Sequence, residues 1–231
     1  DTIERLIGMF AFAVFDRKER VLTLVRDRLG IKPLYWGQIE GRIAFASELK
    51  AFAPLPGFPP EIDRDALASY LCTGYVPAPV SIYRGISKLE PGTMLEVWAD
   101  GVVRTHTYWS ALDVAVRGQS LPMKADEAEA VAQLETLLTD AVTRRMVADV
   151  PLGVFLSGGI DSSTVAALMQ ANSQTPVRSF SIGFDEAAYN EADTAKAVAH
   201  HLGTDHTELY VSAAEAQSVV PKLPQIYDEP F

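Results

Sequence analysis

The sequence is poor in the residues that crosslink a chain or bind nucleic acid. It contains one cysteine, Cys72, so an intramolecular disulfide and a cysteine metal cluster are excluded. Lysine and arginine number 20 against 30 acidic residues, and the net charge of -10 argues against a nucleic-acid partner. No apolar run approaches the length that spans a membrane, and no signal peptide is visible at the first residues. These absences favour a cytoplasmic enzyme with no membrane partner.

The first half of the sequence reads as short strands joined by tight turns. Residues 10–15 and 21–25 flank a polar turn, residues 35–37 and 42–46 turn at Glu40-Gly41, and residues 94–98 and 102–105 flank an Asp-Gly turn. Each pair predicts a hairpin. Taken alone, this half indicates structure and no chemistry, and Arg26, Asp27 and Lys32 are interpreted as a loop salt bridge.

Residues 157–163, Ser-Gly-Gly-Ile-Asp-Ser-Ser, are the most informative segment of the sequence. They lie between an apolar run at 150–156 and a helix-like stretch from Thr164, which predicts a strand, a tight glycine turn and a helix start. Backbone N–H groups in such a turn bind anions, and the helix N-terminus adds a positive dipole end. The alternative is a structural turn in which Asp161 or Ser162 is the helix N-cap. The loop lacks the Gly-Lys-Ser/Thr of a Walker A motif.

The rest of the second half predicts a parallel α/β sheet. Strand-like segments at 177–184 and 206–211 alternate with helix-like segments at 191–202 and from Ala213, and a further helix is expected over 126–147, packed on the sheet. Ligands of such sheets bind at the carboxyl ends of the strands, where Ser157 and Gly183 are expected. Backbone groups at Leu156 and Ile182 are placed to hold an adenine, although strand core is the simpler interpretation of Ile182.

Two sets of motifs resemble known families. The loop at 157–163 resembles the pyrophosphate loop of the N-type ATP pyrophosphatases. The preceding blocks resemble the glutaminase domain of glutamine-hydrolysing asparagine synthetase in its bacterial form, and the order of the two parts also matches. The glutaminase blocks are GMFAFAVFD at 8–16, RDRLGIKPLYW at 26–36, FASELKA at 45–51 and YVPAP at 75–79. Three segments after the loop also match the asparagine synthetase pattern: GFDE at 183–186, YNE at 189–191 and DEPF at 228–231.

The resemblance implies a fold and a set of domains. Residues 1–115 are expected to form the C-terminal part of a class II glutamine amidotransferase domain, an α+β fold like the Ntn hydrolases with an α/β/β/α sandwich. Residues 116–126 are expected to be a linker, and residues 127–231 the N-terminal part of an ATP-pyrophosphatase domain with a doubly wound parallel sheet. The chain is expected to be truncated at both ends relative to the family.

The resemblance also implies an activity. ATP, Mg²⁺, aspartate, and glutamine or ammonia are the expected ligands, and a homodimer is one expected assembly. Asp161 is expected to bind magnesium and to be the catalytic residue of the loop. The resemblance favours a binding role for Ile182 over the simpler interpretation as strand core. The ATP-binding residues that the resemblance implies are Leu156, Ser157, Gly158, Gly159, Asp161, Ser162, Ser163, Ile182 and Gly183.

Two departures from the family pattern limit this reading. The family's glutaminase nucleophile is an N-terminal cysteine, and this chain begins with Asp1. Cys72 is interpreted as a small core residue on the buried face of a helix. The four histidines match no zinc spacing and are interpreted as structural.

Three alternatives stay open at the level of sequence. One is a related amidotransferase or a β-lactam-synthetase-like enzyme that acts on another carboxylic acid. Another is an inactive chain that binds ATP weakly or not at all. The third, a tRNA-directed pyrophosphatase, is opposed by the acidic charge.

Overall fold

The computed structural model describes residues 2–58, 60–184 and 190–230. The chain divides into two compact units, one formed by Asp1–Met123 with Leu223–Phe231 and the other by Lys124–Lys222. Parts of the expected sequence blocks, residues 185–189 and 231, lie outside the described residues. No helix among the described residues is long and apolar enough to cross a membrane.

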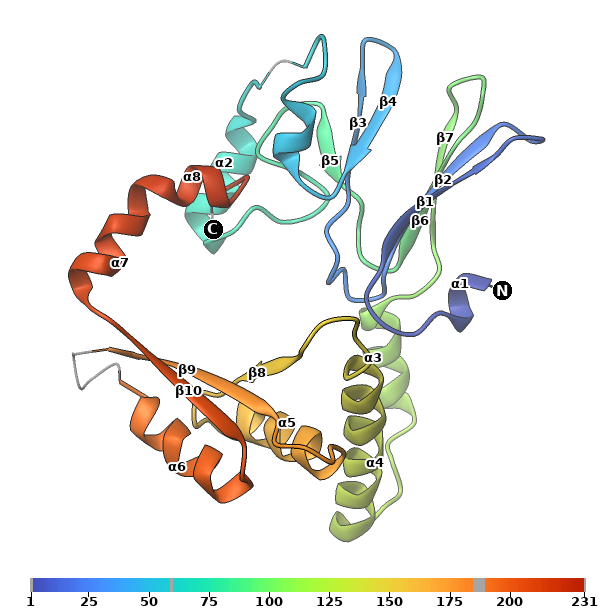
Figure 1. Cartoon of the computed structure of the whole chain (residues 1–231). Helices are drawn as coiled ribbons and strands as arrows, with labels where there is room; N and C mark the ends of the chain where they lie inside the picture. Colours follow the sequence, from blue (N-terminus) through green and yellow to red (C-terminus); the bar gives the residue numbers. More distant parts are fainter. Residues whose placement is uncertain (1, 59, 185–189, 231) are drawn as a thin grey trace. The chain divides into compact units, whose positions relative to one another are not determined.

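The first unit contains two antiparallel sheets (Figure 1), with strand orders β1-β2-β6-β7 and β4-β3-β5. The three predicted hairpins are confirmed as β1–β2, β3–β4 and β6–β7. At the β3–β4 turn, Glu40 and Gly41 have φ of 48° and 77°, the left-handed pair that two-residue hairpins require. The strands are β1 Ala11–Asp16, β2 Val21–Arg26, β3 Tyr35–Ile39, β4 Arg42–Ala46, β5 Ile86–Lys88, β6 Thr93–Val97 and β7 Val103–Thr107.

The two sheets pack face to face, and helix α2 (Arg64–Thr73) covers the smaller one. Leu24 and Leu95 of the larger sheet share a core cluster with Trp36 of β3. The opposite face of β3 presents Tyr35 to a second cluster that includes Ala66 of α2. Alternate residues of one strand therefore serve two cores. The structure gives three layers of the expected α/β/β/α sandwich; within the described residues, the larger sheet has no extended helical layer on its outer face.

The second unit contains a parallel sheet of order β10-β9-β8, as predicted. Its helical side is closely packed because small residues face it: Ala166 of α5 and Ala195 of α6 pack with Leu156. Helix α4 packs on α5 through Val142. The elements are α4 Glu127–Arg145, β8 Gly153–Phe155, α5 Ile160–Ala171, β9 Arg178–Phe184, α6 Ala192–Leu202, β10 Asp205–Val211 and α7 Ala213–Val219.

The doubly wound arrangement is not realised among the described residues. The strands follow one another in sequence order, so right-handed crossovers place α5 and α6 on the same face of the sheet, as Figure 1 shows. On the other face the side chains of Phe155, Phe180 and Ile182 are 78%, 36% and 48% exposed. The predicted parallel sheet is therefore present with helices on one side.

The expected linker at 116–126 is partly helical. Helix α3 (Ala111–Ser120) begins at Ser110, whose side chain accepts a hydrogen bond from the backbone N–H of Asp113. Gly118 suggested a break, but one glycine costs a helix only about 1 kcal/mol. Residues 223–230 pack in the first unit, although the expected domain bounds group them with the second half of the chain. The remaining short elements are α1 Thr2–Arg5, η1 Leu49–Phe52, η2 Val220–Lys222 and α8 Leu223–Ile226.

Candidate nucleotide site

The loop after β8 is closed by its own serines. The Ser157 and Ser162 hydroxyl oxygens lie 2.8 Å apart, and the backbone N–H of Ser157 donates to Ser162 Oγ at 3.2 Å. Ser157 Oγ in turn accepts from the backbone N–H of Gly159 at 3.3 Å. These bonds use hydroxyls to fix the loop while leaving most of its backbone donors unused.

The first turn of α5 leaves its N–H groups available to a ligand. Gly159 is the N-cap and has no side chain to accept from them. Among the described residues, no acceptor meets the N–H groups of residues 158, 160, 161 and 162. Uncapped donors at the start of a 12-residue helix, with its positive dipole end, are able to bind an anion. The alternative in which Asp161 or Ser162 is the N-cap is not observed, because Gly159 takes that position and Ser162 Oγ is engaged by Ser157.

Gly158 lets the loop approach helix α6. Its φ is 77°, in the left-handed region that favours glycine. A Cβ at this position would lie 2.8 Å from Thr194 Cγ2 and 3.0 Å from the backbone nitrogen of Ala195. The loop therefore needs glycine here for both its conformation and its packing.

Asp161 presents an exposed carboxylate at the start of α5. It lies in the first turn of α5, its side chain is exposed, and its carboxylate makes no hydrogen bond or ion pair with any described residue. Carboxylate and phosphate oxygens are the ligands that Mg²⁺ prefers. Groups of three or more His, Cys, Asp or Glu side chains that could hold a metal are absent from the described residues.

The backbone of Ile182 faces the space beyond the end of β8. Leu156 N–H donates to the carbonyl oxygen of Phe180 at 2.8 Å, so the backbone of Phe180 points toward β8. Alternate residues of a strand point to the same side, so the N–H and C=O of Ile182 also point there. The β8–β9 register ends at the pair Phe155–Phe180, so no described strand pairs with Ile182 on this side. Leu156 and Ile182 thus offer backbone groups at the carboxyl end of the sheet.

The structure gives the other predicted residues different surroundings. Ser163 Oγ is buried and has no partner among the described residues. Gly183 pairs with Tyr210 of β10, and a Cβ on it would lie 2.6 Å from the Tyr210 ring. Gly183 therefore permits close packing of β9 against Tyr210, and its backbone points away from the loop.

The interpretation of Asp27 as a salt-bridge partner is wrong. The Asp27 side chain is 1% exposed, and it accepts backbone N–H bonds from four residues at 2.9–3.2 Å. Burial opposes its ionisation, but these bonds prevail and hold the pKa of Asp27 below its usual value. The Arg26 guanidinium donates to the backbone carbonyls of Gly30, Lys32 and Leu89. Both charges organise the loop backbone.

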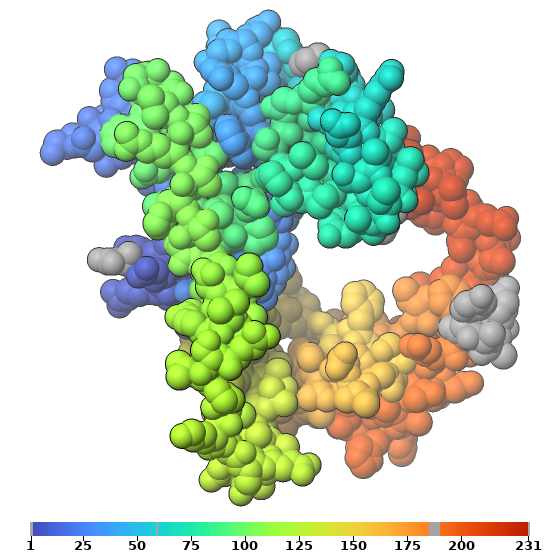
Figure 2. Space-filling model, turned by 180° about the vertical axis from the view of Figure 1, so that it is seen from behind, coloured from blue at the N-terminus to red at the C-terminus, as the bar shows by residue number. Residues whose placement is uncertain are grey.

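The interpretation of Cys72 as a core residue is also wrong. It lies near the C-terminal end of α2, on the surface of the first unit (α2 is cyan in Figure 2), and its thiol is exposed. The predicted helix is confirmed, but Ala66 is the residue of α2 that is fully buried. His206 has the structural role expected of it, with its ring nitrogens 2.8 Å and 3.1 Å from the hydroxyls of Ser179 and Ser181.

Sequence reasoning missed a charged cluster in the first unit. A cavity of about 390 Å³ is lined by residues of η1 and β5 and by the closing segment of the chain. Two lysines, Lys50 and Lys88, meet Asp228 and Glu229 there. The partners are more than 140 positions apart in sequence. Local patterns contain no signal for such a pairing.

The matches to known families follow the two halves of the chain. Residues 1–109 match the glutamine amidotransferase domain family, and residues 133–231 match the asparagine synthase family. Each match covers less than half of the chain, and the two matches do not overlap.

The curated relatives agree with both matches. The chain is 33% identical over its whole length to asparagine synthetase [glutamine-hydrolyzing] 1 of Bacillus subtilis and covers 35% of that protein. It is 36% identical to putative asparagine synthetase [glutamine-hydrolyzing] 2 of Methanocaldococcus jannaschii and covers 44% of it. The chain is similar to these synthetases over its whole length, and it spans less than half the length of either relative.

A solved structure of glutamine phosphoribosylpyrophosphate amidotransferase from B. subtilis matches 99% of the chain and 62% of its own length. The identity is 14% and the TM-score is 0.33, too low to establish a shared fold.

Proposed function

We propose that this chain is part of a glutamine-dependent asparagine synthetase, which converts aspartate, glutamine and ATP to asparagine, glutamate, AMP and pyrophosphate. The observation that carries the proposal is the set of unpartnered N–H groups at the start of α5 beside the unpartnered carboxylate of Asp161. This combination suits a polyphosphate with its metal ion. The amidotransferase match at residues 1–109 supports glutamine as the nitrogen source.

Different residues of the loop and of β9 contact the phosphates, the adenine and the magnesium ion at the proposed ATP site. The backbone N–H groups of residues 158, 160, 161 and 162 hold the β,γ-phosphates and stabilise the departing pyrophosphate. The N–H and C=O of Ile182, with the carbonyl of Leu156, orient the adenine at the end of the sheet. Asp161 holds magnesium, which when bound neutralises charge on the phosphates. The side-chain carboxylate of aspartate then attacks the α-phosphorus, and the α–β phosphoanhydride bond breaks.

The second half of the reaction consumes the acyl-adenylate. Ammonia released from glutamine attacks the acyl carbon, and AMP leaves with the electrons of the acyl–oxygen bond. Cys72 is not proposed as the glutaminase nucleophile, because it lies on the exposed surface of a helix. We further propose a cytoplasmic enzyme that has no nucleic-acid partner, in keeping with the net charge of -10, and that assembles as a homodimer.

Exchange of Asp161 tests the site. In the full-length protein, Asp161→Asn is expected to weaken magnesium-ATP binding about tenfold or more, because a hydrogen bond to a charged group is worth about 1.5–3 kcal/mol. Asp193→Asn is the matched control: Asp193 is also an exposed acid in the first turn of a helix, α6. Calorimetry measures binding, and chromatography measures asparagine and AMP. Equal binding by Asp161→Asn and wild type would refute the assignment of Asp161, and failure of the wild type to form asparagine would refute the proposed reaction.

A further inference from the structure

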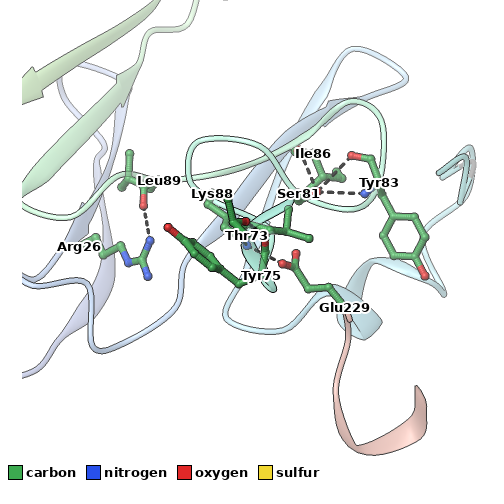
Figure 3. Close-up of polar contacts among 10 residues, drawn as sticks. Arg26, Thr73, Tyr75, Ser81, Tyr83, Ile86, Lys88, Leu89 and Glu229 are labelled. Carbon is green, nitrogen blue, oxygen red and sulfur yellow. Dashed lines mark hydrogen bonds and ion pairs between the residues drawn. The ribbon is translucent and has the colours of Figure 1, made fainter. Parts of the chain in front are cut away.

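The closing segment of the chain is anchored to the first unit by two ion pairs. Lys50 Nζ lies 3.4 Å from Asp228 Oδ1, and Lys88 Nζ lies 2.5 Å from Glu229 Oε2. Figure 3 shows the Glu229 carboxylate extending from this segment to Lys88. Residues 223–231 lie within the asparagine synthase match, but residues 223–230 pack with the unit that contains the amidotransferase match. We call Lys50, Lys88, Asp228 and Glu229 the anchor.

The Lys88–Glu229 pair is largely removed from solvent. The two side chains are 14% and 12% exposed. Lys88 also donates to the backbone carbonyl of Val76, and its Nζ lies 6.0 Å from the centroid of the Tyr35 ring. Burial, with the negative charges of Glu229 and Asp228, raises the pKa of Tyr35. Because a lone charge in such a place is strongly disfavoured, the pair is stable only when both partners are present.

The Lys50 pair holds the same segment at a second point. Lys50 Nζ donates to the backbone carbonyls of Gln225 and Ile226 at 3.3 Å and 3.4 Å, groups that the end of short helix α8 leaves without intrahelical partners. Asp228 is 12% exposed, whereas Lys50 is 48% exposed. One lysine therefore fixes both the helix end and the acid that follows it.

We propose that the anchor couples glutamine hydrolysis to amide formation. The proposal rests on the proposed function. The segment 223–230 lies within the asparagine synthase match, but two ion pairs hold it in the amidotransferase domain. Breaking the Lys88–Glu229 pair would leave a buried charge without its partner, which is costly. A change at the ATP domain that pulls on residues 223–230 thus acts directly on η1 and β5 of the amidotransferase domain. The four residues are positioning residues and take no part in bond breaking.

Separate measurement of the two half-reactions tests the anchor. Wild type, Glu229→Gln and Asp228→Asn are assayed with glutamine, for glutamate and asparagine, and again with ammonium in place of glutamine. We expect the glutamate-to-asparagine ratio to rise about fivefold or more in Glu229→Gln, the lower range of measured coupling between sites. The rate with ammonium is expected to stay within about twofold of wild type, which general misfolding would not permit.

Control variants separate coupling from stability. Glu61→Gln breaks an exposed ion pair with Arg84 in the same unit, whose side chains are 59% and 58% exposed, and should leave the ratio unchanged. Asp228→Asn removes the more exposed pair and keeps the test valid if Glu229→Gln does not fold. A wild-type ratio in folded Asp228→Asn and Glu229→Gln overturns the anchor proposal. Absence of asparagine from wild type with both nitrogen sources overturns the proposed function instead.

Discussion

Substitution of Gly158 by alanine tests whether the loop is held in place by its contact with α6. At φ 77°, a residue with a Cβ costs about 1–2 kcal/mol relative to glycine. The new Cβ would also lie 2.8 Å from Thr194 Cγ2 and 3.0 Å from the backbone nitrogen of Ala195. The second of these neighbours is helix backbone, which cannot rotate away. Overpacking of this kind costs about 1–3 kcal/mol, so the expected loss of unfolding free energy is about 2–5 kcal/mol in total.

Gly203→Ala supplies the control. Gly203 ends α6 with a φ of 72°, close to that of Gly158, and its Cβ position has no heavy atom within 4 Å. Its substitution by alanine therefore carries the backbone cost alone, about 1–2 kcal/mol. The difference between the two variants, measured by urea unfolding, isolates the contact with α6.

Magnesium-ATP binding by the same two variants connects the loop to the ligand. If the Gly158→Ala loop moves away from α6, at least one N–H group leaves its position, and the affinity is expected to fall about tenfold or more. Gly203→Ala should bind ATP as wild type does. Equal unfolding free energies for the two variants would refute the packing argument. A strongly destabilised Gly158→Ala with unchanged affinity would refute the loop as the phosphate site.

Further predictions concern single buried groups. Asp27→Asn removes one acceptor oxygen and leaves two backbone donors unmatched, at a cost of about 2–4 kcal/mol in urea unfolding. The pKa of Asp27 is lowered in the folded protein, so the contribution of its carboxylate to the unfolding free energy is complete above the unfolded pKa of about 3.9. This contribution is lost as the pH falls through the lower folded pKa. Wild type should therefore lose this part of its stability below about pH 4, and Asp27→Asn should not. Gly183→Ala should destabilise by about 1–3 kcal/mol, and Tyr210→Ala should offset part of that loss in a double-mutant cycle.

Features encoded by neighbouring residues could be predicted from the sequence. The period-2 strands of the first half and the alternation of strands and helices in the second are present at nearly the predicted positions. The loop at 157–163 was recognisable because its glycines and hydroxyls lie within seven consecutive residues. Its N-cap could not be assigned from the sequence, because serine and aspartate usually outrank glycine there and the Ser157–Ser162 hydrogen bonds exist only in the folded loop.

The assignment of Cys72 shows why helix periodicity alone can mislead. Ala66 and Tyr70 of α2 face the core and are four positions apart, as one helix face requires. Cys72 follows Tyr70 by two positions, about 200° around the helix at 100° per residue. The apolar residues on both faces of α2, including the exposed Leu71, concealed which face is buried. The choice depends on where β3 lies, which the helix sequence does not specify.

The prediction that Asp27 forms a salt bridge was wrong for a different reason. Basic neighbours in sequence suggest ion pairs, but a loop that turns around a carboxylate can present several backbone N–H groups to it at once. Four such bonds satisfy Asp27 more completely than one flexible lysine, and they hold residues 27–32 in a single conformation. A carboxylate can accept hydrogen bonds from a basic side chain or from backbone N–H groups, so the residue types alone do not choose between an ion pair and the backbone bonds. The φ and ψ angles of the loop make that choice.

The anchor could not be predicted, because any of the 30 acidic residues is a candidate partner for each lysine until the fold selects one. The arrangement of the anchor nevertheless fixes the register of the closing segment. Asp228 and Glu229 are adjacent, and their lysines lie on different elements, Lys50 in η1 and Lys88 at the end of β5. A slip of the segment by one residue would bring Asp228, with its shorter side chain, toward Lys88 and leave one buried charge unmatched. Two neighbouring acids with separate partners therefore fix the register of the closing segment, which a single ion pair would not.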